Sequence, residues 1–300
     1  MAADTWIVIL AAGDGTRLRS VTQASDGTVV PKQFCAFGAG RTLMAATLAR
    51  ARKLAPMSRI VPVVAEAHRR WWELEVAELP PENVVVQPRN RGTAPGLLLP
   101  LLRVLGSDSS ATVVVLPSDH EVEREDVLLA AIGDAERLAG EDASGVFLLG
   151  MTPDGPETEY GWIVPSSART RSGTHRVRTF VEKPDRERAL AAMRDGASWS
   201  SFIMVGRVGA FLDLYFASAP ALLRSFLSAA RRCPILQAGD PPVVLRELYD
   251  AMLPLDFSRD ILQRESVRGA LRLVPVAPCG WSDLGTPARL SRWLQARATA

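Results

Sequence analysis

The chain has 300 residues, of which 47% are hydrophobic and 23% charged, so it can bury the core of one large or two modest domains. Its 35 basic and 33 acidic residues are mixed along the sequence, which excludes the basic stripe of a nucleic-acid-binding protein. No stretch approaches the roughly 18 apolar residues of a membrane-spanning helix, and the apolar run at 6–12 is too short for a secretory signal, so we expect no membrane segment.

Short β-branched runs alternate with amphipathic segments through the first half of the chain. The runs predict strands over 6–12, 59–65, 83–88, 111–117 and 145–150. Apolar residues recurring every three or four positions predict helices over 42–54, 67–79, 93–105 and 125–138. Strands that are apolar on both faces and alternate with helices indicate an α/β fold, with a doubly wound, mostly parallel sheet. Functional residues then belong on the loops that follow the strands.

The pattern changes from about residue 160. The stretches GWIVP and THRVRTFVEKP predict a β-hairpin, helical segments follow, and residues 271–276 predict a late strand. The sequence shows neither an internal repeat nor a low-complexity tract. We therefore expect one domain over residues 1–300, made of a half at 1–150 and a half at 151–300.

The three cysteines, Cys35, Cys233 and Cys279, lie far apart and show neither CxxC nor Cys/His spacing. An odd number of isolated cysteines argues against a disulfide framework and against a zinc site. We expect reduced thiols in a cytoplasmic protein.

The first predicted strand runs into glycines and an arginine. Gly13 and Gly15 let the backbone approach a ligand closely and expose N–H groups to an anion, and Arg17 offers a bidentate fork for phosphate oxygens. The same stretch could equally be a tight strand-to-helix turn with a surface arginine. It lacks the Lys-Ser/Thr of a Walker loop, and Leu18 stands where GxGxxG needs its third glycine.

The stretch LAAGDGTRL, followed by PKQF at 31–34, resembles the signature of sugar-phosphate nucleotidylyltransferases, and most closely their mannose-1-phosphate guanylyltransferase branch. The resemblance continues in family order through QPRNRGTAPG (87–96), LPSDH (116–120), PETEYGWIVP (156–165), FVEKPD (180–185), WSSFIMVGR (199–207), LDFSRD (255–260) and WSDLGT (281–286). It implies a single catalytic domain of Rossmann-like nucleotidyltransferase fold, with a nucleotide-binding half at 1–150 and a sugar-phosphate-binding half at 151–300.

The resemblance also implies an activity and a set of site residues. The enzyme would join a sugar 1-phosphate, here mannose 1-phosphate, to a nucleoside triphosphate, here GTP, with Mg²⁺ as cofactor and pyrophosphate as second product. Its partners would be these small molecules, with no nucleic acid or membrane, and a homodimer stays open. The residues implied for the nucleotide are Ala11, Ala12, Gly13, Gly15, Thr16, Arg17, Lys32, Gln87, Arg91, Gly92, Thr93 and Ala94. Those implied for the sugar phosphate are Tyr160, Gly161, Glu182, Lys183 and Ser200. The catalytic groups would be Arg17, Lys32, Asp119 and Asp283, with the two aspartates holding the metal.

The residue types support a metal pair. Asp119 follows a predicted buried strand, where it could instead cap the next helix. Mg²⁺ takes one or two carboxylates together with substrate phosphates, and Asp283, 164 positions later, offers the second. We expect His120 to be a structural neighbour, because Mg²⁺ prefers oxygen.

Other candidates have ordinary alternatives. Lys32 could be a solvated loop lysine, Thr93 reads as the N-cap of the next helix, and Gly161 could be a hairpin glycine. Glu182 and Lys183 could form an exposed charge pair worth at most ~1 kcal/mol. The family resemblance favours the site roles.

Two positions depart from the family pattern and leave alternatives open. Gly92 stands where many members have Asn, and Ser200 replaces the usual Asn of Trp-Asn-Ser. The base and the sugar therefore stay undecided, and a uridylyl- or cytidylyltransferase or a non-catalytic nucleotide-sugar sensor remains an alternative. A nicotinamide-dependent reductase is disfavoured by the incomplete GxGxxG.

Overall fold

The computed structural model of the protein describes residues 4–23, 26–37, 40–169, 174–232 and 239–298. The strands are β1 Thr5–Ala11, β2 Ile60–Ala65, β3 Val85–Gln87, β4 Thr112–Pro117, β5 Val146–Met151, β6 Gly161–Arg169, β7 His175–Glu182, β8 Ser198–Arg207 and β9 Leu271–Val276. The α-helices are α1 Arg19–Thr22, α2 Leu43–Arg52, α3 Arg69–Trp72, α4 Thr93–Ser107, α5 Glu125–Glu141, α6 Arg186–Arg194, α7 Val208–Ser218, α8 Pro220–Arg232, α9 Val243–Ala251, α10 Gln263–Glu265 and α11 Pro287–Ala298. Cys35 and Cys279 are free thiols, and Cys233 lies outside the described residues.

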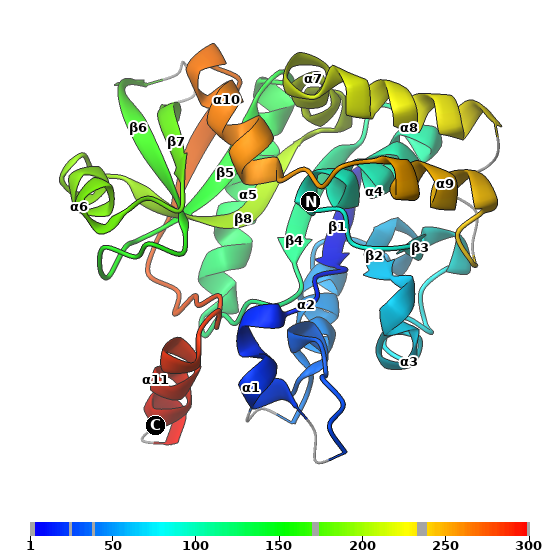
Figure 1. Ribbon diagram of the computed structural model, residues 1–300. Coiled ribbons are helices and arrows are strands. Elements are labelled where there is room, and N and C mark those ends of the chain that lie inside the picture. Colours follow the sequence, from blue (N-terminus) through cyan, green and yellow to red (C-terminus); the bar gives the residue numbers. More distant parts are fainter. Residues whose placement is uncertain (1–3, 24–25, 38–39, 170–173, 233–238, 299–300) are drawn as a thin grey trace.

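The described strands form one nine-stranded sheet in the order β3-β2-β1-β4-β8-β5-β9-β7-β6 (Figure 1). Strands β3, β2, β1 and β4 are parallel, as the sequence predicts, and so are β5 and β9. Strand β8 runs antiparallel between β4 and β5, and the expected hairpin of β6 and β7 completes the far edge. The α/β fold is confirmed, but the expected parallel order holds chiefly in the first half, because β8 and the hairpin introduce antiparallel pairs.

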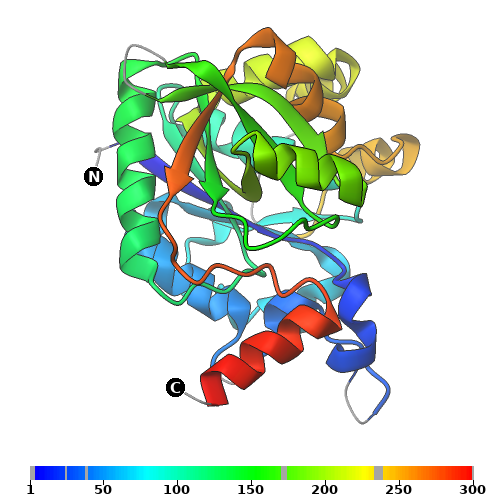
Figure 2. The same cartoon turned by 90° about the vertical axis from the view of Figure 1, so that its left-hand side faces the viewer.

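Helices cover both faces of this sheet, because its strands are apolar on both faces. Along β1, Ile7 and Ile9 enter one core with α2 and α5, whereas Trp6 and Val8 enter the other with α4, α7, α8 and α9. In Figure 2, α5 (green) and the helices coloured yellow to orange lie on opposite sides of the sheet. Because β3, β2, β1 and β4 are parallel, their C-terminal ends face the same set of loops.

Within the described residues, no helix is both long and apolar enough to cross a membrane.

The helix predicted over 67–79 is wrong for most of its length. A 3₁₀ turn at Glu66–His68 leads into α3, which ends at Trp72, and turns follow as far as Leu79. Trp72, Val76 and Leu79 are nevertheless each 4% exposed, so the apolar spacing identified the buried side chains correctly. The Trp72 indole N–H donates to the Ala65 carbonyl at 2.8 Å, which fixes this short element against the end of β2.

The start of α4 is shaped by a segment from the second half of the chain. Leu255 donates its N–H to the Arg91 carbonyl and accepts from the Ala94 N–H, both at 3.0 Å. Gly92, at φ 90°, is the N-cap, and a Cβ there would overlap the Leu255 carbonyl. Thr93 is therefore not the predicted N-cap, and its Oγ1 instead accepts from the Phe257 N–H at 2.7 Å. The glycine that departs from the family pattern is required by this backbone contact.

Replacing Gly92 tests that requirement. Gly92→Ala should lower the free energy of unfolding by at least about 1–3 kcal/mol, because alanine resists this backbone conformation and its Cβ meets the Leu255 carbonyl. Urea denaturation measures the loss. Gly133→Ala, in the exposed middle of α5 with open space around its Cβ, is the control and should raise stability by about 0.5–1 kcal/mol. Equal changes in the two variants would contradict the assignment.

Candidate active site

The glycine loop after β1 is held from behind by the PKQF segment. Gly15 lies at φ 59°, and a Cβ there would come within 2.9 Å of the Lys32 backbone nitrogen. The Gln33 side-chain amide donates to the Ala11 and Gly13 carbonyls, each at 2.9 Å. With its carbonyls fixed in this way, the loop presents Gly13 to open space.

Lys32 extends from the same segment into a nearly enclosed position, with 5% of its side chain exposed. Its ammonium group donates to Asp119 Oδ2 at 3.0 Å and to the backbone carbonyl of Asp283. It lies outside the lining of both cavities described below. The structure thus places the predicted phosphate-binding lysine between the two predicted metal-binding aspartates.

Asp119 and Asp283 come from loops that run side by side. Glu121 and Ser282 exchange backbone hydrogen bonds of 2.9 and 3.0 Å in an isolated antiparallel bridge, so the two aspartates are neighbours across it. Asp119 does not cap α5, whose N-cap is Arg124. Burial raises the pKa of the Asp119 carboxyl, but the neighbouring groups, the Lys32 ammonium first among them and Arg17 also, together outweigh that effect and lower it to about 2. The group is therefore ionised at neutral pH.

The Asp283 carboxylate is oriented on one side and open to cations on the other. Its Oδ1 accepts from the Tyr160 hydroxyl at 2.5 Å and from the Gly285 N–H at 2.8 Å. Its Oδ2 lies 3.9 Å from the Arg17 guanidinium, which also contacts Glu159 at 3.4 Å. Arg17 is 49% exposed, so it can leave these carboxylates for a ligand.

Helix α11 clamps the loop that carries Tyr160. Arg289 donates twice to Glu157 Oε2, at 2.9 and 2.6 Å, and its guanidinium lies over the rings of Tyr160 and Trp199 at 4.6 and 5.1 Å. Burial lowers the pKa of the guanidinium less than the neighbouring Tyr160 and Glu157 raise it, so the charge is retained. A C-terminal helix thereby fixes the tyrosine that orients Asp283.

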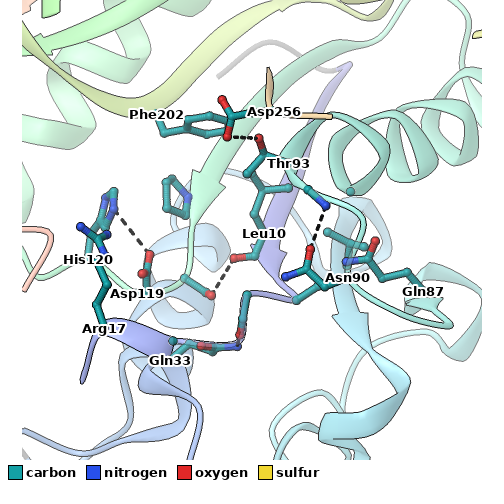
Figure 3. A pocket seen from close by; sticks show the side chains of 18 residues that line it. Leu10, Arg17, Gln33, Gln87, Asn90, Thr93, Asp119, His120, Phe202 and Asp256 are labelled. Atoms are coloured by element: carbon teal, nitrogen blue, oxygen red, sulfur yellow. Dashed lines mark hydrogen bonds and ion pairs between the residues drawn. The ribbon is translucent and has the colours of Figure 1, made fainter. Parts of the chain in front are cut away.

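Two cavities meet at these residues, and the first follows the carboxyl ends of the parallel strands. It encloses about 390 Å³ above an apolar floor of Leu10, Val63 and Pro117. Figure 3 shows Arg17, His120 and Asp119 on one side of it and Gln87 and Asn90 on the other. The predicted nucleotide residues that line it are Ala12, Gly13, Gly15, Arg17, Gln87, Gly92 and Thr93.

The remaining predicted nucleotide residues lie outside both linings. Ala11 is a buried part of β1, and Thr16 is exposed in the 3₁₀ turn after the loop. Arg91 donates to the Tyr249 carbonyl at 2.7 Å, at the end of α9. The Ala94 carbonyl accepts from the Tyr215 hydroxyl at 2.7 Å. Arg91 and Ala94 thus attach the start of α4, which borders the first cavity, to α9 and α7.

The second cavity, of about 200 Å³, lies beside the hairpin of β6 and β7. The structure brings all five predicted sugar-phosphate residues together in its lining, which includes Tyr160, Gly161, Glu182, Lys183 and Ser200. Burial, and after it the Asp256 carboxylate, raise the pKa of Glu182 from its ordinary value of 4.5 to about 7. Gly161 leaves room for this side chain, because a Cβ there would lie 2.9 Å from Glu182 Oε2.

Among the residues that line both cavities, Asp256 and Phe202 were not among the predicted site residues. Asp256 lines both cavities and accepts from Thr93 at 3.4 Å, and its signal was the LDFSRD stretch that the family resemblance already contained. Phe202 also lines both cavities; it lies in the WSSFIMVGR stretch of the family resemblance, but nothing in that stretch indicates its positive φ. His120, which we expected to be a structural neighbour, lines both cavities as well; burial lowers its pKa, and its Nδ1 accepts from the Trp281 indole at 3.3 Å.

The donor set suits a hard divalent cation. Asp119 lines the first cavity with 39% of its side chain exposed, and Asp283 lines the second. The described part of the chain has no group of three His, Cys, Asp or Glu side chains arranged for a metal. Two carboxylates are nevertheless what Mg²⁺ typically takes when phosphate oxygens complete its coordination. The residues therefore fit this metal only together with a phosphate ligand.

Residues 7–298 match the family model described as nucleotidyl transferase. The alginate biosynthesis protein AlgA of Pseudomonas syringae pv. tomato is 30% identical over 282 residues, which cover 93% of this chain and 56% of that protein. The mannose-1-phosphate guanylyltransferase of Escherichia coli K12 is 29% identical over 289 residues, covering 93% and 57%. The chain thus spans a little over half the length of these curated relatives.

Solved structures share the fold. A protein from Thermus thermophilus, described as a mannose-1-phosphate geranyltransferase, superposes with a TM-score of 0.77 at 26% identity, over 94% of this chain and 76% of that one. The inositol-1-phosphate CTP transferase of T. maritima superposes with a TM-score of 0.62 at 16% identity, over 99% and 96%. The expected nucleotidyltransferase fold is therefore confirmed. Because the family model matches nearly the whole chain, the protein belongs to the nucleotidyl transferase family.

Proposed function

We propose that this protein transfers a nucleotidyl group from a nucleoside triphosphate to a sugar 1-phosphate and releases pyrophosphate. The observation that carries the proposal is the position of Asp119 and Asp283, which Lys32 links and which line one cavity each. The first cavity suits a nucleotide, and the second offers polar groups for a sugar and its phosphate. The acidic pair lies where the reacting phosphates would meet.

The chemistry requires positioning more than proton transfer. A phosphate oxygen of the sugar 1-phosphate attacks the α-phosphorus of the triphosphate, the new P–O bond forms, and the bond to pyrophosphate breaks. The attacking oxygen is already ionised, so no general base is needed. Arg17 lines both cavities and exchanges Glu159 and Asp283 for phosphate oxygens, which offsets the charge that develops at phosphorus.

The two carboxylates would hold Mg²⁺, as their oxygen donors suggest. When bound, the ion supplies positive charge that neutralises the phosphates of both ligands. Lys32 keeps the pair together and, by lowering the pKa of Asp119, keeps that carboxylate ionised. Tyr160 and Gly285 orient Asp283 so that its second oxygen stays open.

For the substrates we propose GTP and mannose 1-phosphate, in line with the names of the relatives. The Tyr249 hydroxyl donates to Gln87 Oε1 at 3.1 Å, and this leaves the amide Nε2 as a donor for a base carbonyl in the first cavity. In the second cavity, Glu182 would bind sugar hydroxyls and Lys183 the sugar phosphate. Pyrophosphate release from each triphosphate paired with each sugar 1-phosphate tests the pairing.

Neutralising the acidic pair tests the shared role. Asp119→Asn and Asp283→Asn should each lower kcat/KM by about 100-fold or more, and the double variant should lose little beyond the worse single one, because groups acting as a unit are non-additive. Mn²⁺ affinity, measured by calorimetry with the triphosphate present, should fall in parallel. Asp126→Asn, on the exposed side of α5, is the control. Independent, multiplicative losses would show that the carboxylates do not share an ion.

Lys183 should act on one substrate alone. Lys183→Ala should raise KM for the sugar 1-phosphate about 10- to 100-fold, as expected for one lost charge-assisted hydrogen bond of about 1.5–3 kcal/mol, and should leave KM for the triphosphate unchanged. Steady-state kinetics with each substrate varied gives both constants. Lys53→Ala, on the surface beyond α2, is the control. Equal effects on both substrates would place Lys183 elsewhere in the mechanism.

The raised pKa of Glu182 predicts a pH dependence of stability. The folded protein holds this proton more tightly than the unfolded chain does, so the wild type loses stability as pH rises from about 4.5 to about 7. Glu182→Gln cannot lose a proton there, so its stability relative to wild type should increase between about pH 5 and pH 8. Urea denaturation at both pH values measures it. Glu187→Gln, an exposed carboxylate on α6, should show no such trend, and a flat difference for Glu182→Gln would refute the assignment.

A further inference from the structure

Strand β8 departs from regular strand geometry where it passes the two cavities. Residues 201–203 stand opposite Leu149 alone, which makes a β-bulge in the pairing with β5. At its centre, Phe202 lies at φ 59°, in the left-handed region that aromatic residues rarely adopt. The bulge turns the ring of Phe202 away from the regular alternation of the strand.

Two serine hydroxyls stabilise this conformation. Ser201 Oγ donates to the Leu149 carbonyl at 2.7 Å and accepts from the Ile203 N–H at 3.1 Å, in place of strand hydrogen bonds. Ser200 Oγ accepts from the Phe202 N–H at 3.4 Å. Two serine side chains therefore stabilise a backbone conformation that is unfavourable for phenylalanine. Strained conformations of this kind concentrate at functional sites.

Phe202 lines both cavities, and Figure 3 shows its ring among the residues that line the first. It packs edge-to-face on Phe257, with ring centroids 5.9 Å apart and planes at 64°. The residues that line both cavities with it are Arg17, Thr93, His120 and Asp256. Because these four are polar or charged, Phe202 is the apolar surface at the junction.

Its neighbours along the chain face the sugar side. Ser200 and Ser201 line the second cavity but not the first, and so does Ser258, which follows Phe257. The first cavity already has its own apolar floor. In the second, Tyr160 is 5% exposed and its hydroxyl is bound to Asp283, so its ring offers little surface. Trp281 is a partly exposed aromatic of the same lining, but its ring packs edge-to-face on Tyr160 and His120 and its indole N–H is bound to His120. A pyranose has C–H faces as well as hydroxyls, and Phe202 is placed to cover one of them.

We propose that Phe202 determines sugar specificity by packing its ring against a C–H face of the bound sugar, while Glu182 and Lys183 bind the polar groups. This inference rests on the proposed function. If a hydroxyl of the sugar projected from the face that packs on the ring, binding would remove water from that hydroxyl. The aromatic ring offers no hydrogen bond in exchange, so such a sugar would bind more weakly. Phe202 thus selects between sugars that differ only in the orientation of one hydroxyl.

Replacing Phe202 by glycine separates this role from folding. Glycine adopts the same backbone conformation without strain, and this gain offsets the lost packing on Phe257, so the melting temperature should change by no more than about 3 °C. KM for the preferred sugar 1-phosphate should rise about 10-fold, with KM for the triphosphate within about twofold. The preference among mannose, glucose and galactose 1-phosphates, as a ratio of kcat/KM, should narrow about 10-fold.

Three further variants complete the test. Phe202→Tyr keeps the ring and should retain the wild-type preference, whereas Phe202→Leu keeps bulk without a flat face and should lose it, which keeps the test decisive where Phe202→Gly fails to fold. Phe216→Ala removes a phenylalanine that is 70% exposed on α7 and should leave both KM values unchanged. Unchanged sugar preference in Phe202→Leu, or equal KM increases for both substrates, would overturn the proposal. Absence of turnover in the wild type with every pair of substrates would instead overturn the proposed function.

Discussion

A single buried ammonium group organises the site. Lys32 is almost inaccessible to water, and a charge in that position is tolerated only when carboxylate and carbonyl oxygens replace its hydration. Asp119 and the Asp283 carbonyl supply them from loops 164 positions apart. The same lysine backbone supports Gly15 of the glycine loop. The buried ammonium group needs these oxygen partners, so it fixes three loops relative to one another. Residues of the same three loops line the two cavities.

Much of the fold can be predicted from the local sequence pattern. The five predicted strands of the first half match β1 to β5 within two residues at each end, because runs that are apolar on both faces have no stable place outside a helix-covered sheet. Three of the four predicted helices form, as α2, α4 and α5, because their apolar residues recur on one face that packs against the sheet. The segment 67–79 fails because its apolar spacing satisfies burial through turns as well as through a helix. Spacing identifies the buried side chains, and backbone hydrogen bonds decide the element.

The site is only partly readable in the same way. Residues on loops after strands gather as predicted, and the five sugar-phosphate candidates share one cavity. The contacts that override local expectation come from distant segments: Leu255 turns Gly92 rather than Thr93 into the N-cap, and Lys32 is drawn to two aspartates. The WSSFIMVGR stretch contains Phe202 but does not predict its conformation, since a positive φ in a strand depends on the register with β5. Local sequence therefore predicts which residues lie near the site, but the contacts they make depend on which distant segments the fold brings beside them.

The antiparallel strand β8 has a consequence for how the chain is assembled. Strand β4 pairs with β1 on one edge, and its other edge pairs with β8, which lies some 80 residues further along the chain. During synthesis, the parallel strands therefore expose an unpaired edge until residue 207 has emerged, and such edges invite pairing with other chains. Strand β8 closes this edge and in the same step brings Phe202 to the cavities. Strand β9 and the loop that carries Asp283 follow later in the chain, so this edge can close, and Phe202 can be placed, before the sheet and the binding site are complete.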